Sequence, residues 1–345
     1  MKKIGNFKIS EKSKTLVIAE VGQSHLGSFS KVNSIIKKIS KTGADFIKFQ
    51  THIASEESTK DEPFRVKNRQ FKNRIEYWRK MEFTYKQWKK IKKNCEKNNI
   101  CFLSSPFSIK AVNLLNKLNV IGWKIGSGEF FSTSMIDKII KTKKPIIIST
   151  GLSKISEIKK IVKKFKKNNC NFILLQCTSL YPSKLKDIGI NILDQFKKEF
   201  KCKVGLSDHS GSIYPSIFAI CKGASVVEVH VGDVSEKNNP DSTSSISFND
   251  LKELCSARDE INIMKNNDQS KLKLSKRLLK IKKIFTKSCA VNKFMKKNRI
   301  IKKEDIIFKK PGIGIPENNL NYIIGKKLIK DVYPDRILKL KDIKL

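Results

Sequence analysis

Short apolar runs of about five residues alternate with longer amphipathic stretches along most of the chain. The runs are rich in branched and aromatic residues, as strands are, and the stretches between them repeat apolar positions with the period of a helix. The pattern predicts eight strands, at Leu16–Val21, Phe46–Gln50, Cys101–Ser105, Trp123–Gly126, Pro145–Thr150, Phe172–Cys177, Lys203–Asp208 and Ser225–Val231. It predicts helices at Lys31–Thr42, Tyr85–Asn98, Ile109–Leu118, Thr133–Lys141, Ile155–Lys167, Asn191–Phe200, Ser212–Lys222 and Asn249–Met264.

Eight strands that alternate with eight helices predict an α/β protein, specifically a (β/α)8 or TIM barrel, over residues 1–264. The start of the chain, Ile4–Lys14, is expected to form a hairpin across the bottom of this barrel. Residues 265–280 are polar and are predicted to be a linker. Residues 281–345 are predicted to be a small β domain, with strands near Cys289–Asn292 and Ile306–Phe308 and a binding or capping role.

The connection between the second and third strands, Thr51–Phe83, is unusually long. Loops of this size in compact domains tend to be lids or binding loops. Its mixed charge is also typical of a plain surface insertion, so both interpretations stay open.

Polar residues follow the apolar part of every predicted strand. In a (β/α)8 barrel the chemistry takes place where the strands end, at their carboxyl ends. One polar strand end would only mean that a strand reaches water, whereas eight such ends indicate a site. The residues are Glu20, Lys48 with Gln50, Ser104 with Ser105, Lys124 with Ser127 and Glu129, Ser149 with Thr150, Cys177 with Thr178 and Ser179, Ser207 with Asp208 and His209, and Glu228 with His230.

Two of the four histidines, His209 and His230, end successive predicted strands. The helix between them completes a βαβ unit, whose strands usually lie parallel and close together. Neutral imidazole is a common ligand of divalent ions, so the two side chains are predicted to share one metal ion. Two hydrogen-bonded core histidines are the alternative.

Two lysines and four serines at the strand ends predict an anion site. Lys48 and Lys124 supply positive charge, and nearby glycines let backbone N–H groups approach a ligand. Taken alone, each serine would more readily be a turn residue or a helix N-cap. A lysine at a strand end could instead form a Schiff base, as in aldolases. The serines are Ser105, Ser127, Ser149 and Ser207, the glycines are Gly126, Gly128 and Gly151, and Glu20 and Glu129 are candidates for acid–base work.

The amino-acid composition argues against nucleic-acid and membrane partners. The chain has 72 Lys and Arg against 32 Asp and Glu, a net charge of +40, but the excess is mainly lysine spread over helix faces. A solvated surface that attracts anionic substrates fits better than a nucleic-acid footprint, so no nucleic-acid partner is expected. Eight cysteines without a C-x-x-C pair argue against a zinc knuckle and a disulfide framework. Without an apolar span of about 18 residues, no membrane partner is expected and cytoplasm is the expected location.

Nine segments, which together cover nearly the whole chain in order, carry a resemblance to a known family. They are IAEVGQSHLGS, GADFIKFQTHIASEESTKDEPFRVK, FLSSPFS, WKIGSGE, KPIIISTGLS, LLQCTSLYP, VGLSDHSG, GASVVEVHV and KKPGIGIP. In these segments the chain resembles the sialic acid synthase (N-acetylneuraminate synthase) family, a phosphoenolpyruvate-condensing barrel followed by an antifreeze-like SAF domain.

The resemblance implies a transferase of the N-acetylneuraminate synthase type, and a role for each matching residue. It implies that His209 and His230 hold Mn²⁺ or Mg²⁺, which polarises the aldehyde of an open-chain N-acyl hexosamine such as N-acetylmannosamine. It also implies a domain-swapped homodimer, in which the SAF domain caps the partner's barrel. Phosphoenolpyruvate would be held by Lys48, Ser105, Lys124, Ser127, Ser149 and Ser207, sugar or metal-shell positions match Glu20, Gln50, Tyr181 and Asp241, and Glu129 matches the acid near the reacting carbons.

The sequence departs from the family pattern at three places. Ser24-His25-Leu26-Gly27 stands where Asn-His-Asn-Gly is common, and Ser242 follows Pro240-Asp241 where the family has His. Lys287 replaces the SAF-domain arginine expected at the N-acyl group, and the two are not interchangeable at a bidentate contact. The acceptor therefore stays open between N-acetylmannosamine and the precursors of legionaminate or pseudaminate. A Schiff-base aldolase and a basic non-enzymatic binding protein are the alternatives from other classes.

Overall fold

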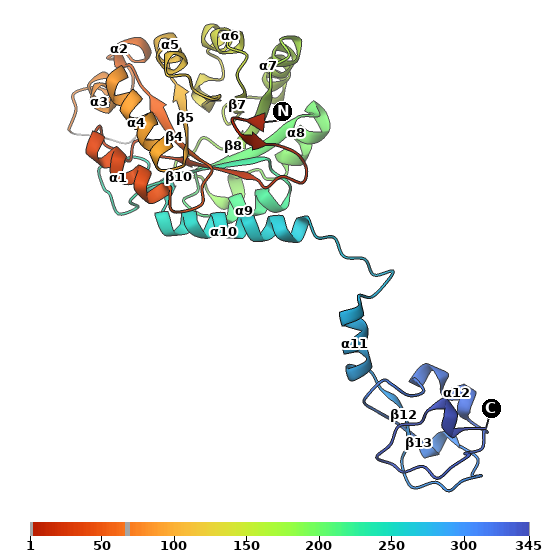
Figure 1. Ribbon diagram of the computed structural model, residues 1–345. Helices are drawn as coiled ribbons and strands as arrows, with labels where there is room; N and C mark the ends of the chain where they lie inside the picture. Colours follow the sequence, from red (N-terminus) through yellow and green to blue (C-terminus); the bar gives the residue numbers. More distant parts are fainter. Residues whose placement is uncertain (1–2, 66–69, 345) are drawn as a thin grey trace. The chain divides into compact units, whose positions relative to one another are not determined.

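Eight parallel strands form a nearly closed barrel in the computed structural model, which describes residues 3–65 and 70–344. Hydrogen bonds join the strands in the order β5-β4-β3-β10-β9-β8-β7-β6, and β5 lies against β6. The predicted (β/α)8 barrel is therefore confirmed, with helices around the outside of the strands (Figure 1). The strands are β3 (Leu16–Glu20), β4 (Phe46–Thr51), β5 (Cys101–Pro106), β6 (Trp123–Ile125), β7 (Ile146–Ser149), β8 (Phe172–Cys177), β9 (Lys203–Asp208) and β10 (Val226–Val231).

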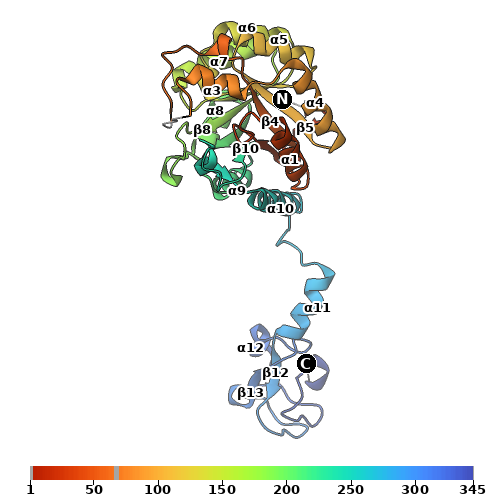
Figure 2. The ribbon, with the colours of Figure 1, turned by 90° about the vertical axis from the view of Figure 1, so that its left-hand side faces the viewer.

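A helix is present at each of the eight predicted places. The observed helix ends differ from the predicted ends by a few residues. The first of these helices starts earlier than expected because Ser28 caps it, accepting a hydrogen bond from the Lys31 amide. In the view of Figure 2 the helices are again seen packed around the strands. They are α1 (Phe29–Ile39), α4 (Tyr85–Lys97), α5 (Ile109–Lys117), α6 (Thr133–Lys141), α7 (Ile155–Lys167), α8 (Ile192–Phe200), α9 (Tyr214–Cys221) and α10 (Phe248–Lys265).

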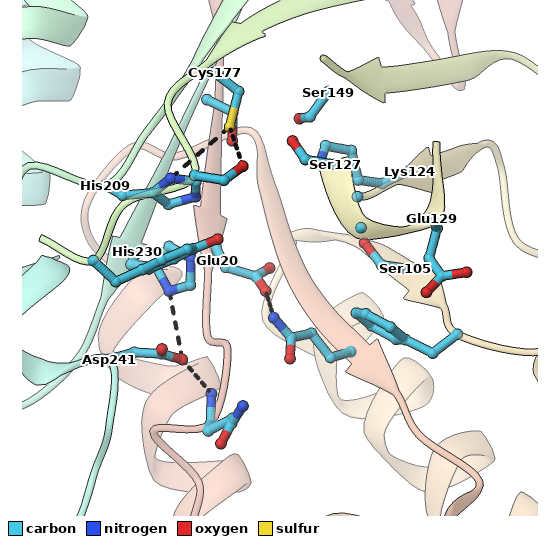
Figure 3. Close-up of a pocket in the computed structure, with 18 of the residues that line it drawn as sticks. Glu20, Ser105, Lys124, Ser127, Glu129, Ser149, Cys177, His209, His230 and Asp241 are labelled. Atoms are coloured by element: carbon cyan, nitrogen blue, oxygen red, sulfur yellow. Dashed lines mark hydrogen bonds and ion pairs between the residues drawn. The ribbon is translucent and has the colours of Figure 1, made fainter. Parts of the chain in front are cut away.

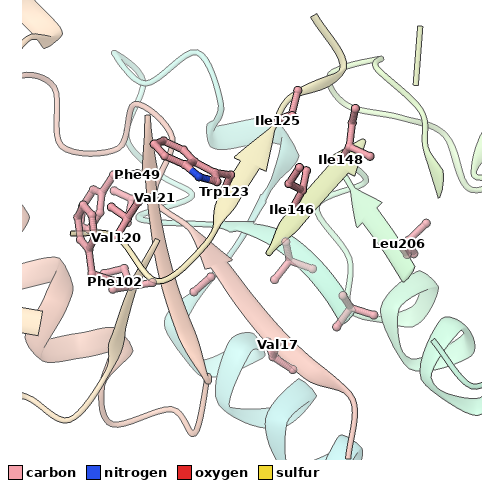
Figure 4. Close-up of a cluster of buried hydrophobic side chains, with 14 of the residues drawn as sticks. Val17, Val21, Phe49, Phe102, Val120, Trp123, Ile125, Ile146, Ile148 and Leu206 are labelled. Carbon is pink, nitrogen blue, oxygen red and sulfur yellow. The ribbon is translucent and has the colours of Figure 1, made fainter. Parts of the chain in front are cut away.

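Alternation along the strands separates two apolar layers. Side chains of one parity, such as Val17, Phe49 and Ile148, point toward the helices and join the main core (Figure 4). Side chains of the other parity, such as Leu16, Phe46 and Val226, fill the inside of the barrel near the strand starts. The residues that follow these inner positions by two or four places are the polar strand ends, which therefore face the same interior.

The predicted hairpin at the start of the chain is present and closes the bottom of the barrel. Strands β1 (Lys3–Ile4) and β2 (Phe7–Lys8) pair antiparallel. Ile4 is fully buried in the inner apolar cluster, and the Phe7 ring lies 5.0 Å from that of Phe46. The interior is thus sealed by apolar contacts at this end.

The connection between β4 and α4 contains two helices, α2 (Ala54–Glu57) and α3 (Arg74–Met81). They share a small cluster of buried side chains, Ala54, Tyr77, Trp78 and Met81. Residues 66–69 of the predicted long loop lie outside the described residues. Three short elements interrupt the other loops around the barrel: the 3-10 helices η1 (Ser127–Glu129) and η2 (Leu185–Asp187), and the segment η3–β11 (Ser242–Ser244 and Ser245–Ile246) that follows β10.

The chain divides into two compact units, residues 1–267 and 268–345. The second unit has its own buried core, which includes Cys289, Val291 and Ile301. Its two predicted strands are confirmed as the antiparallel pair β12–β13, and residues 276–280 of the predicted linker belong to the exposed helix α11. The elements are α11 (Lys276–Phe285), β12 (Ser288–Val291), η4 (Lys303–Asp305), β13 (Ile306–Lys309), η5 (Glu317–Asn319), α12 (Leu320–Ile323) and η6 (Leu340–Asp342).

The eight cysteines are all free. Cys95, Cys177, Cys255 and Cys289 are buried, whereas Cys221 is exposed. Within residues 3–65 and 70–344, no helix has the length and apolar character needed to cross a membrane.

Candidate active site

A cavity of about 380 Å³ opens at the carboxyl ends of the barrel strands (Figure 3). All the barrel residues predicted to have a catalytic, substrate or metal role line it, whereas the strand-end residues Ser104, Thr150, Thr178 and Asp208 do not. Lys287 is an exposed residue of the second unit. The structure therefore brings the predicted residues together, although their chemical roles stay predictions. The lining includes Glu20, Lys48, Gln50, Ser105, Lys124, Ser127, Glu129, Ser149, Tyr181, Ser207, His209, His230 and Asp241.

Four buried charges form the floor of the cavity. Lys48 Nζ lies 2.6 Å from Glu20 Oε2 and 3.7 Å from Glu228 Oε1, and Lys124 Nζ lies 3.3 Å from the same Glu228 oxygen. Strand register explains the first pair, because Glu20 is directly opposite Lys48 on adjacent parallel strands. Each of these side chains is at most 4% exposed, so the ion pairs are almost unscreened by water.

This network moves the pKa values of its members apart. Burial raises the pKa of Glu20, even though Lys48 opposes the rise. Burial would also raise the pKa of Glu228, but Lys124 and Lys48 lower it below its usual value. Burial lowers the pKa of Lys124, whereas for Lys48 the same effect is outweighed by Glu20 and Glu228, so its pKa is raised. Glu228 therefore stays a carboxylate, and Glu20 is the carboxyl group that takes up a proton first.

Hydroxyl groups surround the two lysines. Lys48 donates to Ser105 Oγ at 3.1 Å, and Ser207 Oγ donates to Glu228 Oε1 at 3.2 Å. Ser149 Oγ is buried and has no hydrogen-bond partner among the described residues. Buried polar groups are nearly always paired, so this hydroxyl is free to donate to a ligand.

The Ser127 hydroxyl is held at the cavity wall by the backbone of Gly151, which lies close to it. The Gly151 N–H donates to Ser127 Oγ at 3.0 Å. A Cβ atom at Gly151 would meet Ser179 Oγ at 2.4 Å and Ser127 Oγ at 3.0 Å, so only glycine fits here without displacing the hydroxyl. Glu129, whose pKa is raised by burial, accepts a hydrogen bond from Ser132 on the same side of the cavity.

The two strand-end histidines lie together, with ring centroids 5.2 Å apart. His209 Nδ1 donates to the Thr178 carbonyl oxygen at 2.9 Å, so Nε2 is the atom that could bind an ion. Burial lowers the pKa of His209, but Cys177 and Glu228 outweigh this effect and raise it, so the ring must give up a proton before it can bind an ion. His230 Nδ1 is buried without a hydrogen-bond partner among the described residues and lies 3.8 Å from Asp241 Oδ2. Burial lowers the pKa of His230 to about 3, so the ring is neutral, as a metal ligand must be.

These features fit a divalent ion bound by two imidazoles. Where the chain is described, however, no group of three or more His, Cys, Asp or Glu side chains is arranged as a metal site. The two histidines can therefore supply two ligands, and an ion bound there would need further ligands from water or substrate.

The long β4–α4 connection supplies part of the cavity wall, which favours its interpretation as a binding loop. Arg65 Nη2 lies 2.7 Å from Asp241 Oδ1, and the Arg65 guanidinium sits 4.2 Å from the centre of the Tyr181 ring. Tyr181 in turn packs on His209 with ring centroids 4.2 Å apart. One loop arginine therefore holds two of the predicted sugar-site residues.

The structure adds residues to which the sequence assigned no role. Glu228 and Cys177 were among the predicted polar strand ends but had no chemical role, and the structure places both in the lining of the cavity. The Cys177 thiol lies 3.9 Å from His209 Nδ1, and His209 lowers its pKa although burial opposes this. Arg65, Glu57 and Trp78 come from the long connection, where no periodicity marks the residues that turn inward.

Comparison with known proteins finds the same two parts. Residues 35–270 match the NeuB family, and residues 290–344 match the SAF domain. A Campylobacter jejuni N,N'-diacetyllegionaminic acid synthase is 32% identical over 94% of this chain and 99% of its own length. A Campylobacter jejuni pseudaminic acid synthase is 30% identical over 98% of this chain and 99% of its own length.

The crystal structure of an N-acetylneuraminic acid synthetase from Leptospira borgpetersenii superposes with a TM-score of 0.70. It is 25% identical in sequence, and the alignment covers 81% of this chain and 94% of that one.

Replacing Glu228 by Gln is expected to destabilise the barrel by about 3 kcal/mol, because two buried ammonium groups lose their shared counter-charge. Urea unfolding followed by tryptophan fluorescence measures this in the intact chain, since Trp78, Trp88 and Trp123 all lie in the barrel. Glu199→Gln is the matched control: it removes the partner of Lys159, 2.7 Å away at the surface, and should cost less than about 1 kcal/mol. Equal losses in the two variants would contradict the account.

Proposed function

Because this chain belongs to the NeuB family, we propose that it condenses phosphoenolpyruvate with an N-acyl hexosamine and water to give a nonulosonic acid and phosphate. The observation that carries the proposal is the convergence of Lys48, Lys124 and the surrounding serine hydroxyls on one cavity. Phosphoenolpyruvate carries a carboxylate and a phosphate, the groups that such a cavity binds.

For the acceptor, we propose a bacillosamine-type N-acyl sugar, as used for legionaminic or pseudaminic acids. Two Campylobacter jejuni relatives that align over at least 94% of this chain are named for those two products, and this favours them over the N-acetylmannosamine that the sequence resemblance put first. N-acetylmannosamine remains the second candidate, because a sialic acid synthetase shares the fold and a quarter of the aligned residues.

In this reaction the chain's residues act by binding and orientation. Lys48, Lys124 and Ser207, with Ser105, Ser127 and Ser149, hold the anionic groups of phosphoenolpyruvate, and Gln50, Tyr181 and Asp241 hold the sugar. Carbon 3 of phosphoenolpyruvate attacks the sugar aldehyde, water adds at carbon 2, and phosphate leaves. Glu20 and Glu129, whose pKa values burial raises, are placed to take up or release the protons of these steps.

A Mn²⁺ or Mg²⁺ ion bound at His209 and His230 would polarise the aldehyde oxygen. Both histidines line the same cavity as the proposed sugar residues. Lys287, from the second unit, is the proposed contact with the N-acyl group.

Phosphate release from phosphoenolpyruvate across a panel of N-acyl hexosamines tests the function, with the product identified by mass spectrometry. We expect release only with an open-chain N-acyl sugar, fastest with a bacillosamine-type acceptor, and almost none after exhaustive chelation until Mn²⁺ or Mg²⁺ is restored. Full activity in the chelated protein would contradict the metal role. Absence of release with every sugar would contradict the function.

Lys124→Met is expected to raise the KM for phosphoenolpyruvate or lower kcat by at least about a hundredfold, since it removes a buried charge from the anion site. Lys163→Met, on the exposed face of α7, is the control and should change neither constant more than about twofold. Equally small changes of KM and kcat in Lys124→Met and Lys163→Met would show that phosphoenolpyruvate binds elsewhere.

A Schiff-base aldolase is the one rival with a supporting observation, the lowered pKa of Lys124. Borohydride reduction in the presence of pyruvate separates the two. A covalent adduct on Lys124 supports the aldolase, and none supports the synthase.

We also propose that the second unit acts on the barrel of a partner chain in a homodimer. Residues 266–275 contain neither helix nor strand, and ten such residues can span up to about 35 Å. The second unit has its own core, as a separately placed cap requires.

Co-expression of two inactive variants tests this arrangement. His209→Ala breaks the barrel site, and Lys287→Glu breaks the cap. In a swapped heterodimer one intact barrel meets one intact cap, so about half of the sites in each heterodimer should recover. Heterodimers without any recovered activity would show that each cap acts within its own chain.

A further inference from the structure

His52, the residue after β4, is enclosed between two aromatic rings. Its ring centroid lies 4.0 Å from that of Trp78 in α3 and 4.5 Å from that of Phe107 after β5, with interplanar angles of 20° and 23°. The residue is 2% exposed. Both faces of the imidazole are therefore covered, and only its two nitrogen atoms remain for polar contacts.

Both nitrogens of His52 face oxygen atoms. Nδ1 lies 2.6 Å from Glu57 Oε1, and Nε2 lies 3.1 Å from Gln50 Oε1. The orientation of the Gln50 amide follows from its other contact, because its Nε2 donates to Glu20 Oε1 at 2.9 Å. With an acceptor on each side, both nitrogens must carry hydrogen, which describes an imidazolium stacked on Trp78.

His52 reaches the cavity only through its neighbours. Gln50, Glu57, Trp78 and Phe107 line the cavity, and His52 is not among the lining residues. The contacts run from Glu57 through His52 and Gln50 to Glu20, the carboxylate paired with Lys48. They join the loop helices α2 and α3 to strand β4.

We infer that His52 is a positioning residue: its imidazolium, held by Glu57 and two aromatic rings, fixes the Gln50 amide in the orientation that meets the sugar. The inference deepens the proposed function, on which the identity of the ligand rests. Without His52 the Gln50 amide can rotate, and the charge of Glu57 is left without its partner.

Other charged groups around His52 are consistent with a cation at this position. Glu57 faces it from α2, and Glu20 is connected to it through Gln50. Burial raises the pKa of Glu129 in η1, Glu57 adds to the rise, and His52 opposes it.

The variant His52→Phe separates positioning from packing, because phenylalanine keeps the aromatic stack and removes both hydrogen bonds. We expect the KM for the sugar to rise about tenfold, the effect of losing one or two oriented hydrogen bonds, with the KM for phosphoenolpyruvate changed less than about twofold. Glu57→Gln keeps the shape of the side chain and should act in the same direction.

Glu56→Gln is the matched control on the same short helix. Glu56 pairs with Lys110 at 2.7 Å and does not line the cavity, so this variant should keep both constants unchanged. An unchanged KM for the sugar in folded His52→Phe would overturn the inference. An equal rise in the KM for the sugar and in the KM for phosphoenolpyruvate would also overturn it.

A second readout is independent of activity. The chain has four histidines, so ¹⁵N-histidine NMR signals can be assigned by single substitutions. We expect the His52 signals of the intact protein at neutral pH to show two protonated nitrogens, and Glu57→Gln to weaken this state. A neutral tautomer in the wild type would overturn the inference. If the wild type used no sugar, the proposed function would fail, while this spectrum would still decide the state of His52.

Discussion

Burial disfavours the charged form of two lysines in the mouth of the barrel, Lys48 and Lys124, and the carboxylates beside them oppose this effect. An unpaired charge in such a place costs several kcal/mol, so Glu20 and Glu228 are required by the fold as well as by any ligand. The register of β3, β4 and β10 puts these carboxylates in place, since Glu20 is opposite Lys48 and also opposite His230. A shift of any of these strands by one residue would turn its charged side chain toward the apolar helices.

The rest of the barrel supports this arrangement. Apolar side chains fill the interior below the charges, and Ile4 of the hairpin closes the bottom of the barrel. Water can therefore reach the charges only from the open end of the cavity. Low exposure strengthens each ion pair and would strengthen the attraction for a bound anion in the same way. An incoming phosphate or carboxylate can share the two ammonium groups with Glu228, while Ser149, buried without a partner among the described residues, is ready to donate.

Most of the barrel was predictable because its signals are local. The short apolar run of each strand, followed by polar residues, predicted all eight strands and put residues such as Lys124 and His230 at their carboxyl ends. Loop residues carry no such pattern. Arg65 and His52 owe their positions to contacts with Asp241 and Trp78, distant in sequence, so the sequence pattern could not indicate them. Glu228 was marked as a strand end, but its pairing with two lysines depends on register across three strands.

The charged floor of the cavity is the proposed site for phosphoenolpyruvate. A crystal structure of the protein soaked with phosphoenolpyruvate and Mn²⁺ tests it most directly. The account predicts density for the carboxylate and phosphate against Lys48 and Lys124, with Ser127 and Ser149 within hydrogen-bond distance. An empty cavity, with phosphoenolpyruvate bound only among the surface lysines, would contradict it.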